Sequence, residues 1–280
     1  MAVNVDAQYY FRAMLLIDTH THLFTKHFDN DLDEVMQRAK EAGVGLMLLP
    51  DIDAESTPRM KAVCKRFPDM VKPMMGIHPC HVTADYENQL SIVKSELEQG
   101  GYIAVGEIGL DLHWDKESLP FQIIAFEQQM EWAKELKLPV AVHCRTAYDE
   151  VIASITKVQD GNLTGVLHCF TGNLDQANAL LDLGFYLGIG GVVTFKNSGV
   201  AETVAELPMD RLVLETDSPY LAPKPFRGKR NESSYVKFVA EKLAEVKGLP
   251  VEEIADITTK NAIKLFKLEL TNAQQATLNA

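Results

Sequence analysis

An alternation of two kinds of segment recurs along almost the whole chain and limits the folds that it can adopt. A short apolar run rich in β-branched residues is followed by a stretch with helical periodicity, and then another apolar run begins. Alternating strands and helices are typical of a parallel sheet covered by helices. The eight predicted strands are Met14–Asp18, Gly45–Pro50, Val71–Ile77, Tyr102–Glu107, Pro139–His143, Gly165–Cys169, Phe185–Gly190 and Arg211–Thr216.

Stretches of helical periodicity separate these strands, and one more follows the last of them. Several end just before a glycine, the residue that most often closes a helix in the left-handed conformation. Eight strand–helix units favour a single closed (β/α)8 TIM barrel over an open doubly wound sheet. The predicted helices are Asp31–Ala42, Pro58–Arg66, Tyr86–Gln99, Phe121–Leu136, Tyr148–Lys157, Leu174–Leu183, Val200–Glu206, Tyr235–Lys247 and Val251–Phe266.

Domain boundaries follow from where this alternation begins and ends. We expect one barrel domain over residues 14–268, an N-terminal extension over residues 1–13 and a C-terminal tail over residues 269–280. Met14 opens the first apolar run directly, so we interpret it as a candidate native start. The tail is polar, and we expect Leu270–Ala280 to be frayed.

Composition restricts the class of protein. The hydrophobic fraction of 46% supplies a sizeable core. No apolar run is long enough to span a membrane, and the first residues lack the basic start and apolar block of a secretory signal. The four cysteines show no C-x-x-C spacing, which favours free thiols in a reducing compartment. We therefore expect a cytoplasmic monomer that has no membrane partner.

Unusual polar residues gather at the carboxyl ends of the predicted strands. Five of the eight histidines lie there, although chance would scatter them over the surface. In a β/α barrel these strand ends meet at one mouth, where catalytic groups are found. The residues are Asp18, His20 and His22 at the first strand, His78 at the third, Glu107 and Asp111 at the fourth, His143 and Arg145 at the fifth, His168 at the sixth, and Glu215 and Asp217 at the eighth.

Each of these residues, taken alone, has a structural explanation. His20 and His22 could form a hydrogen-bonded surface pair. Glu107 could form a buried salt bridge to Arg145 or to a lysine. A single histidine at a strand end is more often a core residue with its hydrogen bonds satisfied. Their collection at one barrel mouth has no such explanation, and it indicates a metal site.

The spacing of these residues favours two adjacent divalent cations. Residues two apart on a strand share a face, so His20 and His22 can bind one ion. His143 and His168 end successive strands and can bind another. Asp217 ends the last strand, next to the first in a closed barrel, and it can bind a cation or accept a proton. The predicted metal ligands are His20, His22, Glu107, His143, His168 and Asp217.

Strand alternation gives two further expectations. Asp18 lies two residues before His20 on the same face, so we expect its carboxylate to hold a ligand histidine in the correct tautomer. Cys144 and Cys169 each follow a predicted ligand histidine, so we expect both thiols to point to the opposite side.

These residues lie in stretches that resemble the TatD family of metal-dependent hydrolases, within the amidohydrolase-like superfamily. The resemblance extends over about residues 14–266. The matching stretches are LIDTHTHL (16–23), GIHP (76–79), GEIGLDLHW (106–114), VHCR (142–145), LHCFTG (167–172), GGVVTFKN (190–197), ETDSPYLAP (215–223) and FRGKRNE (226–232). One departure is His78-Pro79-Cys80-His81, where the family often has His-Pro-His, and it leaves the role of that loop open.

The resemblance implies a ligand set divided between two metal ions. His20, His22 and Asp217 look like the ligands of one ion, His143 and His168 like those of the other, and Glu107 like the bridge. Family members are described as Mg²⁺-dependent exonucleases that digest single-stranded DNA from the 3′ end. Some have been linked to other hydrolyses, including deacylation of mischarged tRNA.

The charge of the chain bears on the substrate. The net charge of −12 opposes a general attraction to nucleic acid. Positive charge is nevertheless concentrated near the predicted mouth, either as a phosphate clamp or as a solvated basic loop. The basic residues are Arg145, Lys196, Lys224, Arg227, Lys229 and Arg230, of which Arg145, Lys196, Lys224 and Arg227 are the predicted substrate-binding residues. Trp114, Tyr220 and Phe226 either stack on unpaired bases or pack in the protein.

We therefore expect a nuclease that cleaves phosphodiester bonds of single-stranded DNA, or of RNA, with two divalent ions. The predicted catalytic residues are Asp217 as the base, Glu107 as the shared ligand and His78 as a donor to the scissile phosphate. The ions are Mg, Mn or Zn, because the donor set mixes imidazole with carboxylate. The alternative is an acyl or amide hydrolase, such as a tRNA deacylase. A barrel that only binds metal is disfavoured, because a structural site has no open coordination position.

Overall fold

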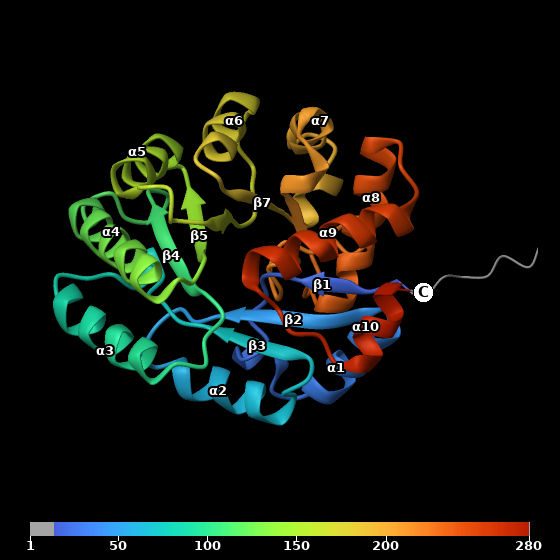
Figure 1. Cartoon of the computed structure of the whole chain (residues 1–280), viewed down its shortest axis with the longest axis horizontal. Coiled ribbons are helices and arrows are strands. Elements are labelled where there is room, and N and C mark those ends of the chain that lie inside the picture. The colour runs from blue at the N-terminus through green and yellow to red at the C-terminus, as the bar shows by residue number, and fades with distance from the viewer. Residues whose placement is uncertain (1–13, 280) are drawn as a thin grey trace, which may run out of the picture.

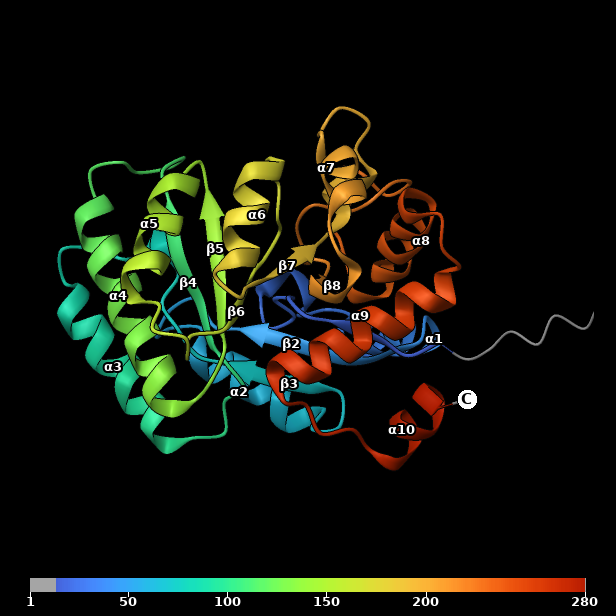
Figure 2. The ribbon, with the colours of Figure 1, turned by 45° about the horizontal axis from the view of Figure 1, so that its top comes forward.

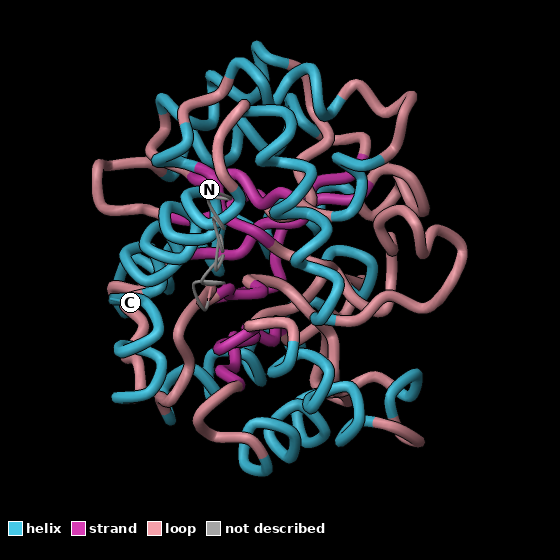
Figure 3. Tube along the Cα trace, turned by 90° about the vertical axis from the view of Figure 1, so that its right-hand side faces the viewer, coloured by secondary structure: helices cyan, strands magenta, loops and turns pink. Residues whose placement is uncertain are grey.

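Eight parallel strands form the centre of the protein, and helices surround them (Figures 1 and 3). The computed structural model describes residues 14–279, so the predicted extension over residues 1–13 lies outside the described residues. The strands are β1 (Leu16–Asp18), β2 (Val44–Pro50), β3 (Val71–Met74), β4 (Val105–Asp111), β5 (Val140–Arg145), β6 (Gly165–Leu167), β7 (Tyr186–Ile189) and β8 (Leu212–Leu214).

The strands pair in chain order as two parallel sheets, β1-β2-β3 and β4-β5-β6-β7-β8. An isolated parallel bridge joins the sheets at each seam. Met75 pairs with Val105 between β3 and β4, and Thr21 pairs with Ser218 just beyond β1 and β8. Eight parallel strands in this cyclic order confirm the predicted β/α barrel.

The helices that follow the strands lie around the outside of the barrel (Figure 1). Within residues 14–279, none of them combines the length and the apolar character that crossing a membrane requires. They are α1 (Leu32–Glu41), α2 (Thr57–Arg66), α3 (Tyr86–Gln99), α4 (Leu119–Leu136), α5 (Tyr148–Val158), α6 (Leu174–Asp182), α7 (Val200–Glu206), α8 (Val236–Lys247), α9 (Val251–Phe266) and α10 (Asn272–Asn279).

Alternate strand residues face two different cores. One row, which includes Ile17 and Leu48, forms an inner cluster, while the other row packs under the surrounding helices. Helix α9 (Figure 2) contributes Phe266 to the inner cluster, and Thr259 Oγ1 donates to Leu15 O just before β1. Helix α9 therefore closes the end of the barrel where the strands begin. The opposite end, where the strands stop, is left for polar side chains.

Strand β4 continues four residues beyond its predicted end at Glu107. The reason is a close approach to β5 that only glycine allows. Gly109 has a φ of 139°, and a Cβ atom there would lie 2.0 Å from His143 O. Both carboxylate residues, Glu107 and Asp111, therefore lie within β4, directly beside β5.

The prediction of a frayed C-terminal tail is wrong, because Asn272–Asn279 forms α10. Thr271 and Gln274 make reciprocal contacts at its start. Thr271 N donates to Gln274 Oε1 at 2.8 Å, and Gln274 N donates to Thr271 Oγ1 at 3.3 Å. Gln274 Nε2 also donates to Gly45 O at 2.7 Å, which ties α10 to β2. The Thr-x-x-Gln spacing is a helix-start signal that the sequence contains.

Candidate metal centre

The carboxylate of Glu107 lies at the middle of a cluster of histidines and is 2% exposed. Its Oε2 atom lies 3.2 Å from His20 Nε2 and 3.5 Å from His22 Nε2. Its Oε1 atom lies 3.0 Å from His143 Nδ1 and 2.9 Å from His168 Nε2. The two oxygens of one carboxylate therefore face two separate pairs of histidines, each pair from a different part of the barrel.

Two more predicted site residues adjoin this cluster. Asp217 Oδ1 lies 3.5 Å from His22 Nε2, on the Oε2 side of Glu107. His78 Nε2 lies 3.4 Å from Glu107 Oε1, on the other side. The structure thus brings together the predicted ligands and His78, and we call this set of seven residues the candidate metal centre. Its members are His20, His22, His78, Glu107, His143, His168 and Asp217.

The charges in the candidate metal centre compensate one another. Burial raises the pKa of Glu107, but the surrounding histidines, above all His78 and His168, hold it well below its usual value. Burial lowers the pKa of His168, but Glu107 and Glu215 more than offset this and leave it well above its usual value. The predicted alternative for Glu107, a salt bridge to Arg145 or a lysine, does not occur among its contacts in the described structure.

Buried polar atoms without a hydrogen-bond partner show that this donor set fits a cation. Among the described residues, they include both ring nitrogens of His20, Nδ1 of His22 and Oε2 of Glu215. Such atoms are costly unless another group satisfies them. Imidazole nitrogens and carboxylate oxygens are ligands of zinc, magnesium and manganese. Ligand atoms lie close enough to hold an ion in three groups, His20-His22-Asp217, His78-Glu107-His143 and His20-His168-Glu215.

Sequence reasoning assigns no role to Asp111, yet it contacts the candidate metal centre. Asp111 is buried, and its Oδ2 atom lies 3.0 Å from His143 Nε2. Burial raises the pKa of Asp111, but hydrogen bonds from His143 and two backbone N–H groups lower it by a larger amount. The net pKa lies below the usual value, so the carboxylate is ionised. It can therefore accept the Nε2 proton of His143, which leaves Nδ1, the nitrogen that faces Glu107, as the atom that would bind a cation. The sequence contains a signal for this contact. Asp111 lies an even number of residues beyond Glu107 in one strand, so both side chains lie on the same face.

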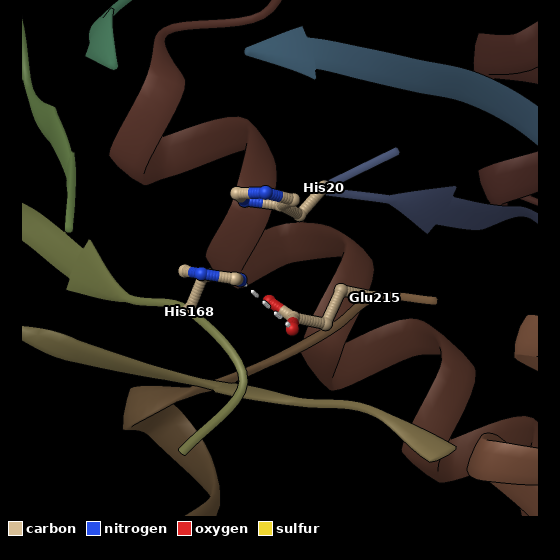
Figure 4. Close-up of side chains that lie close together, drawn as sticks. All are labelled: His20, His168 and Glu215. Atoms are coloured by element: carbon tan, nitrogen blue, oxygen red, sulfur yellow. Dashed lines mark ion pairs between the residues drawn. The ribbon is translucent and has the colours of Figure 1, made fainter. Parts of the chain in front are cut away.

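Glu215 is a second carboxylate without a role in the sequence reasoning. It is fully buried beyond β8, and Figure 4 shows it pointing at the edge of His168, which in turn stacks on His20. Its Oε1 atom lies 3.6 Å from His168 Nδ1 and accepts a 2.6 Å hydrogen bond from Cys169 N. Gly188 makes room for it, because a Cβ atom there would lie 2.1 Å from Glu215 Oε2. Glu215 thus lies as a charged neighbour at the Nδ1 edge of His168, beyond hydrogen-bond distance, and His168 Nδ1 has no hydrogen-bond partner among the described residues.

The Glu215→Gln variant is expected to bind a divalent cation about 10- to 100-fold more weakly than the wild type. Glutamine keeps the size of the side chain and can still accept from Cys169 N. It removes the negative charge that lies 3.6 Å from His168 Nδ1, so the ring loses the electrostatic support of that carboxylate. Calorimetric titration of the metal-free protein with Mn²⁺ or Zn²⁺ measures the change. An exposed-residue control is Glu135→Gln in α4. Equal affinities for all three proteins would remove Glu215 from this role.

The expectation for Asp18 is wrong, because its carboxylate contacts the segment just after β8 instead of a histidine ring. Thr216 N donates to Asp18 Oδ1 at 2.9 Å, and Thr216 Oγ1 donates to Oδ2 at 2.7 Å. Burial raises the pKa of Asp18 to about 7, and these hydrogen bonds oppose the rise. Asp18 therefore ties the ends of β1 and β8 together. The tie helps to hold His20 beside Asp217, whose N–H donates to His20 O.

His78 has a defined tautomer. Its Nδ1 atom accepts a 3.0 Å hydrogen bond from Cys80 N. Burial lowers the pKa of His78 to about 4, against the opposing effect of Glu107, so the ring is neutral at pH 7. A neutral imidazole with an accepting Nδ1 carries its proton on Nε2, so His78 presents an N–H donor to the centre. His81, whose role the sequence leaves open, pairs with Asp53 at 2.9 Å instead.

The cysteines match the expectation in part. All four are free. Cys144 lies in β5 and packs with the outer core, away from the histidines, as predicted. Cys169 departs from the prediction because β6 already ends at Leu167 and Cys169 has a φ of 45°. Its N–H donates to Glu215 Oε1 at 2.6 Å, so this residue adjoins the candidate metal centre. Burial raises the pKa of its thiol, and the charges of Asp217 and Glu215 raise it further.

The predicted substrate-binding residues lie on two sides of the barrel mouth. Arg145 ends β5, and its guanidinium carbon lies 5.4 Å from the ring centre of Trp114. On the other side, Lys196 and Lys224 line an open groove of about 560 Å³ between α7 and α8, together with a third lysine, Lys242, and three glutamates. The guanidinium carbon of Arg227 lies 4.4 Å from the ring centre of Phe195, which also lines that groove.

Arg230 does not belong to a phosphate clamp, because its guanidinium group is already paired with a carboxylate. Its two terminal nitrogens donate to the two oxygens of Asp31 at 2.7 and 2.6 Å. Asp31 directly precedes α1, so this bidentate pair fastens the basic loop after β8 to the start of that helix. The hydrogen bonds from Arg230 lower the pKa of Asp31.

Arg230→Ala is expected to lower the free energy of unfolding by about 1–2 kcal/mol, since the pair is half-exposed. Asp31 has a depressed pKa in the folded state, so its contribution is present above the pKa of a free aspartate and fades as the pH falls below it. The difference between variant and wild type in urea unfolding should therefore shrink in acid. Metal binding should not change. A variant as stable as the wild type at pH 7 would contradict this role.

Two of the three aromatic side chains considered for base stacking are exposed. Trp114 is 71% exposed and Tyr220 is 51% exposed. Phe226 instead packs against Tyr235, with ring centres 4.1 Å apart and nearly parallel planes. The structural interpretation therefore holds for Phe226, whereas Trp114 and Tyr220 are accessible at the mouth.

Comparison with known proteins identifies the family of this chain. A family model described as TatD related DNase matches residues 17–267. The chain belongs to this family. A relative from Bacillus subtilis (strain 168), named uncharacterized metal-dependent hydrolase YabD, is 41% identical, with 91% of this chain and 100% of the relative covered. Family and relatives together make the chain a metal-dependent hydrolase of the TatD type.

Two further relatives agree with this assignment. The crystal structure of YjjV, a TatD homologue from Escherichia coli K12, has a TM-score of 0.85 and 32% identity, with 91% of this chain and 98% of that chain covered. A relative from Erwinia billingiae (strain Eb661), named 3′-5′ ssDNA/RNA exonuclease TatD, is 33% identical, with 90% of this chain and 99% of the relative covered. The likeness to YjjV extends over the whole barrel.

Proposed function

We propose that this hydrolase is a nuclease that cleaves phosphodiester bonds of single-stranded DNA from the 3′ end, using two divalent cations. The observation that carries the proposal is the division of the histidines between the two oxygens of Glu107. A carboxylate that faces two sets of donors is arranged to bridge two ions. The name of the Erwinia relative supports nucleic acid as the substrate class.

The residues that would hold the ions follow from this division. His20, His22 and Asp217 would hold one ion on the Oε2 side of Glu107. His143 and His168 would hold the other on the Oε1 side, where Asp111 is hydrogen-bonded to His143 and the charge of Glu215 lies beside His168. Bound divalent cations supply a Lewis acid that lowers the pKa of water and offsets charge developing on phosphate. Mg²⁺, Mn²⁺ and Zn²⁺ are all compatible with this donor set.

Asp217 is the proposed acceptor of the proton from the attacking water. Burial raises the pKa of its carboxyl group, but His22 and His168 bring the net value below the usual range, so the group is ionised at neutral pH. Its backbone has a φ of 57°, a conformation that aspartate and asparagine adopt more readily than most residues. Its N–H donates to His20 O, which holds the carboxylate beside His22.

His78, Arg145 and Arg227 are proposed to contact the substrate directly. The Nε2–H group of His78 would donate to an oxygen of the scissile phosphate, since the other ring nitrogen, Nδ1, already accepts a hydrogen bond from Cys80 N. Arg145 and Arg227 would pair with neighbouring phosphates, because a planar guanidinium matches two phosphate oxygens. Lys196 and Lys224 would add positive charge on the β7–β8 side of the mouth.

A digestion assay on metal-stripped protein tests this proposal. Mg²⁺, Mn²⁺ or Zn²⁺ is added separately, with a 5′-labelled single-stranded oligonucleotide as substrate. A ladder of shortened products that appears only with metal, and that is absent for His143→Ala, is the expected result. No cleavage by folded, metal-loaded protein would contradict the nuclease and direct the search to the acyl alternative, with aminoacyl-tRNA and lactones as substrates.

A further inference from the structure

Trp114 is the most exposed large hydrophobic residue among residues 14–279, with 71% of its surface accessible. It lies in the loop between β4 and α4, at the end of the barrel that carries the candidate metal centre. Other exposed apolar residues, such as Ile124 and Leu136, lie on the outer surface of helix α4. An indole left in water beside a polar site is typical of a surface that another molecule covers.

The loop that carries Trp114 is held in place by Asp111, the carboxylate that orients His143. His113 N and Trp114 N both donate to Asp111 Oδ1, at 2.8 and 3.3 Å. Gln122 in α4 holds the backbone of Asp111, because its Oε1 atom accepts from Asp111 N at 2.9 Å and its Nε2 atom donates to Asp111 O at 3.2 Å. One side chain therefore fixes both a predicted metal ligand and the exposed ring.

Arg145 completes this arrangement. It lies two residues after His143 in β5, so both side chains leave the strand on the same face. Its guanidinium carbon lies 5.4 Å from the centre of the Trp114 ring, and the His113 ring meets the indole edge-on at 4.8 Å. A cation and a flat apolar ring are thus presented together, in a fixed position next to His143.

We propose that Trp114 and Arg145 form a nucleotide subsite, in which the indole stacks on one unpaired base and the guanidinium pairs with a phosphate of the same strand. Every base offers a flat face, so stacking accepts any sequence but requires an unpaired base. The subsite therefore selects single strands over duplexes. This inference rests on the proposed nuclease function, and it adds the part of the substrate that is recognised and the residues that recognise it.

Tryptophan fluorescence tests the subsite without relying on cleavage. The chain has two tryptophans, and the other, Trp132, is 7% exposed, so binding at the mouth should quench Trp114 alone. Metal-loaded protein is mixed rapidly with a single-stranded oligonucleotide, and emission is recorded before turnover. We expect saturable quenching that is absent in Trp114→Phe. Duplex DNA of the same sequence should quench much less.

Cleavage kinetics with abasic substrates give a second readout. Trp114→Ala should lower kcat/KM on an intact single strand by about ten- to a hundredfold, as expected for the loss of one stacked base, whereas Trp114→Phe keeps a stacking face and should lose less. Single abasic sites are placed in turn near the 3′ end. Removing the base that stacks on Trp114 should slow the wild type until its rate equals that of Trp114→Ala, because the indole then has no base to contact. The control Ile124→Ala, in α4, should behave like the wild type.

The possible outcomes separate the subsite from the proposed function. Cleavage by the wild type that is unaffected by Trp114→Ala, without quenching, would overturn the subsite and leave the nuclease standing. Quenching without cleavage would support the subsite and contradict phosphodiester hydrolysis. Neither quenching nor cleavage would overturn both.

Discussion

Replacing Glu107 by glutamine is expected to lower kcat/KM on a single-stranded oligonucleotide by at least about a thousandfold. Glutamine is nearly the same size, but it has no negative charge and only one oxygen for two sets of histidines. Both proposed ion positions lose their shared ligand. Because each ion contributes several kcal/mol and about 1.4 kcal/mol is a factor of ten, the loss is at least a thousandfold.

Two measurements on Glu107→Gln check this expectation. Elemental analysis of the purified variant should find less bound metal per chain than in the wild type, and circular dichroism should confirm that both are folded. Glu135→Gln, an exposed residue in α4, is the matched control and should retain full activity and metal content. Near-wild-type turnover by Glu107→Gln would exclude Glu107 as a bridging ligand.

Asp217→Asn is expected to lower kcat by about 10²- to 10⁴-fold, the usual contribution of a positioned proton acceptor. Asparagine tolerates the left-handed backbone at this position, so the fold should be preserved. It keeps an oxygen beside His22, but it cannot accept a proton at neutral pH. The acidic limb of the pH–rate profile, which reports ionisation of the base, should therefore disappear in the variant.

A titration with excess metal separates the two roles of Asp217. If the residue acts only as a ligand, high Mg²⁺ or Mn²⁺ concentrations should restore most of the activity of Asp217→Asn. If it accepts the proton, saturating metal leaves kcat low. Unchanged kcat in the variant without added metal would remove Asp217 from the base role.

The fold and the membership of the cluster could be predicted because both depend on local patterns. The alternation of apolar runs with helical stretches specifies eight β/α units, and strand ends of a parallel barrel meet at one mouth. Histidines and carboxylates at those ends must therefore lie near one another. Metal binding by His20, His22, Glu107, His143, His168 and Asp217 stays a prediction, now with distances that an experiment can use.

The partners of individual carboxylates could not be predicted in this way. Asp18 accepts hydrogen bonds from Thr216, 198 residues away in the sequence and just beyond β8, rather than from a histidine ring. Arg230 has a suitable charge and position for phosphate, but Asp31 already binds it. The alternation of residues along a strand indicates on which face of the strand a side chain lies. It carries no information about which residues of a neighbouring strand or loop that side chain contacts.

The β/α barrel, the family and the side chains that meet at the barrel mouth follow from the amino-acid sequence, because periodicity and short motifs are properties of neighbouring residues. That Glu107 faces two pairs of histidines with its two oxygens is visible only in the folded structure. The same holds for the hydrogen bond of Asp111 to His143, the charge of Glu215 beside His168 and the position of Trp114 beside Arg145. These relations depend on the register between strands and on how closely β4 approaches β5, which are set by packing across the whole barrel.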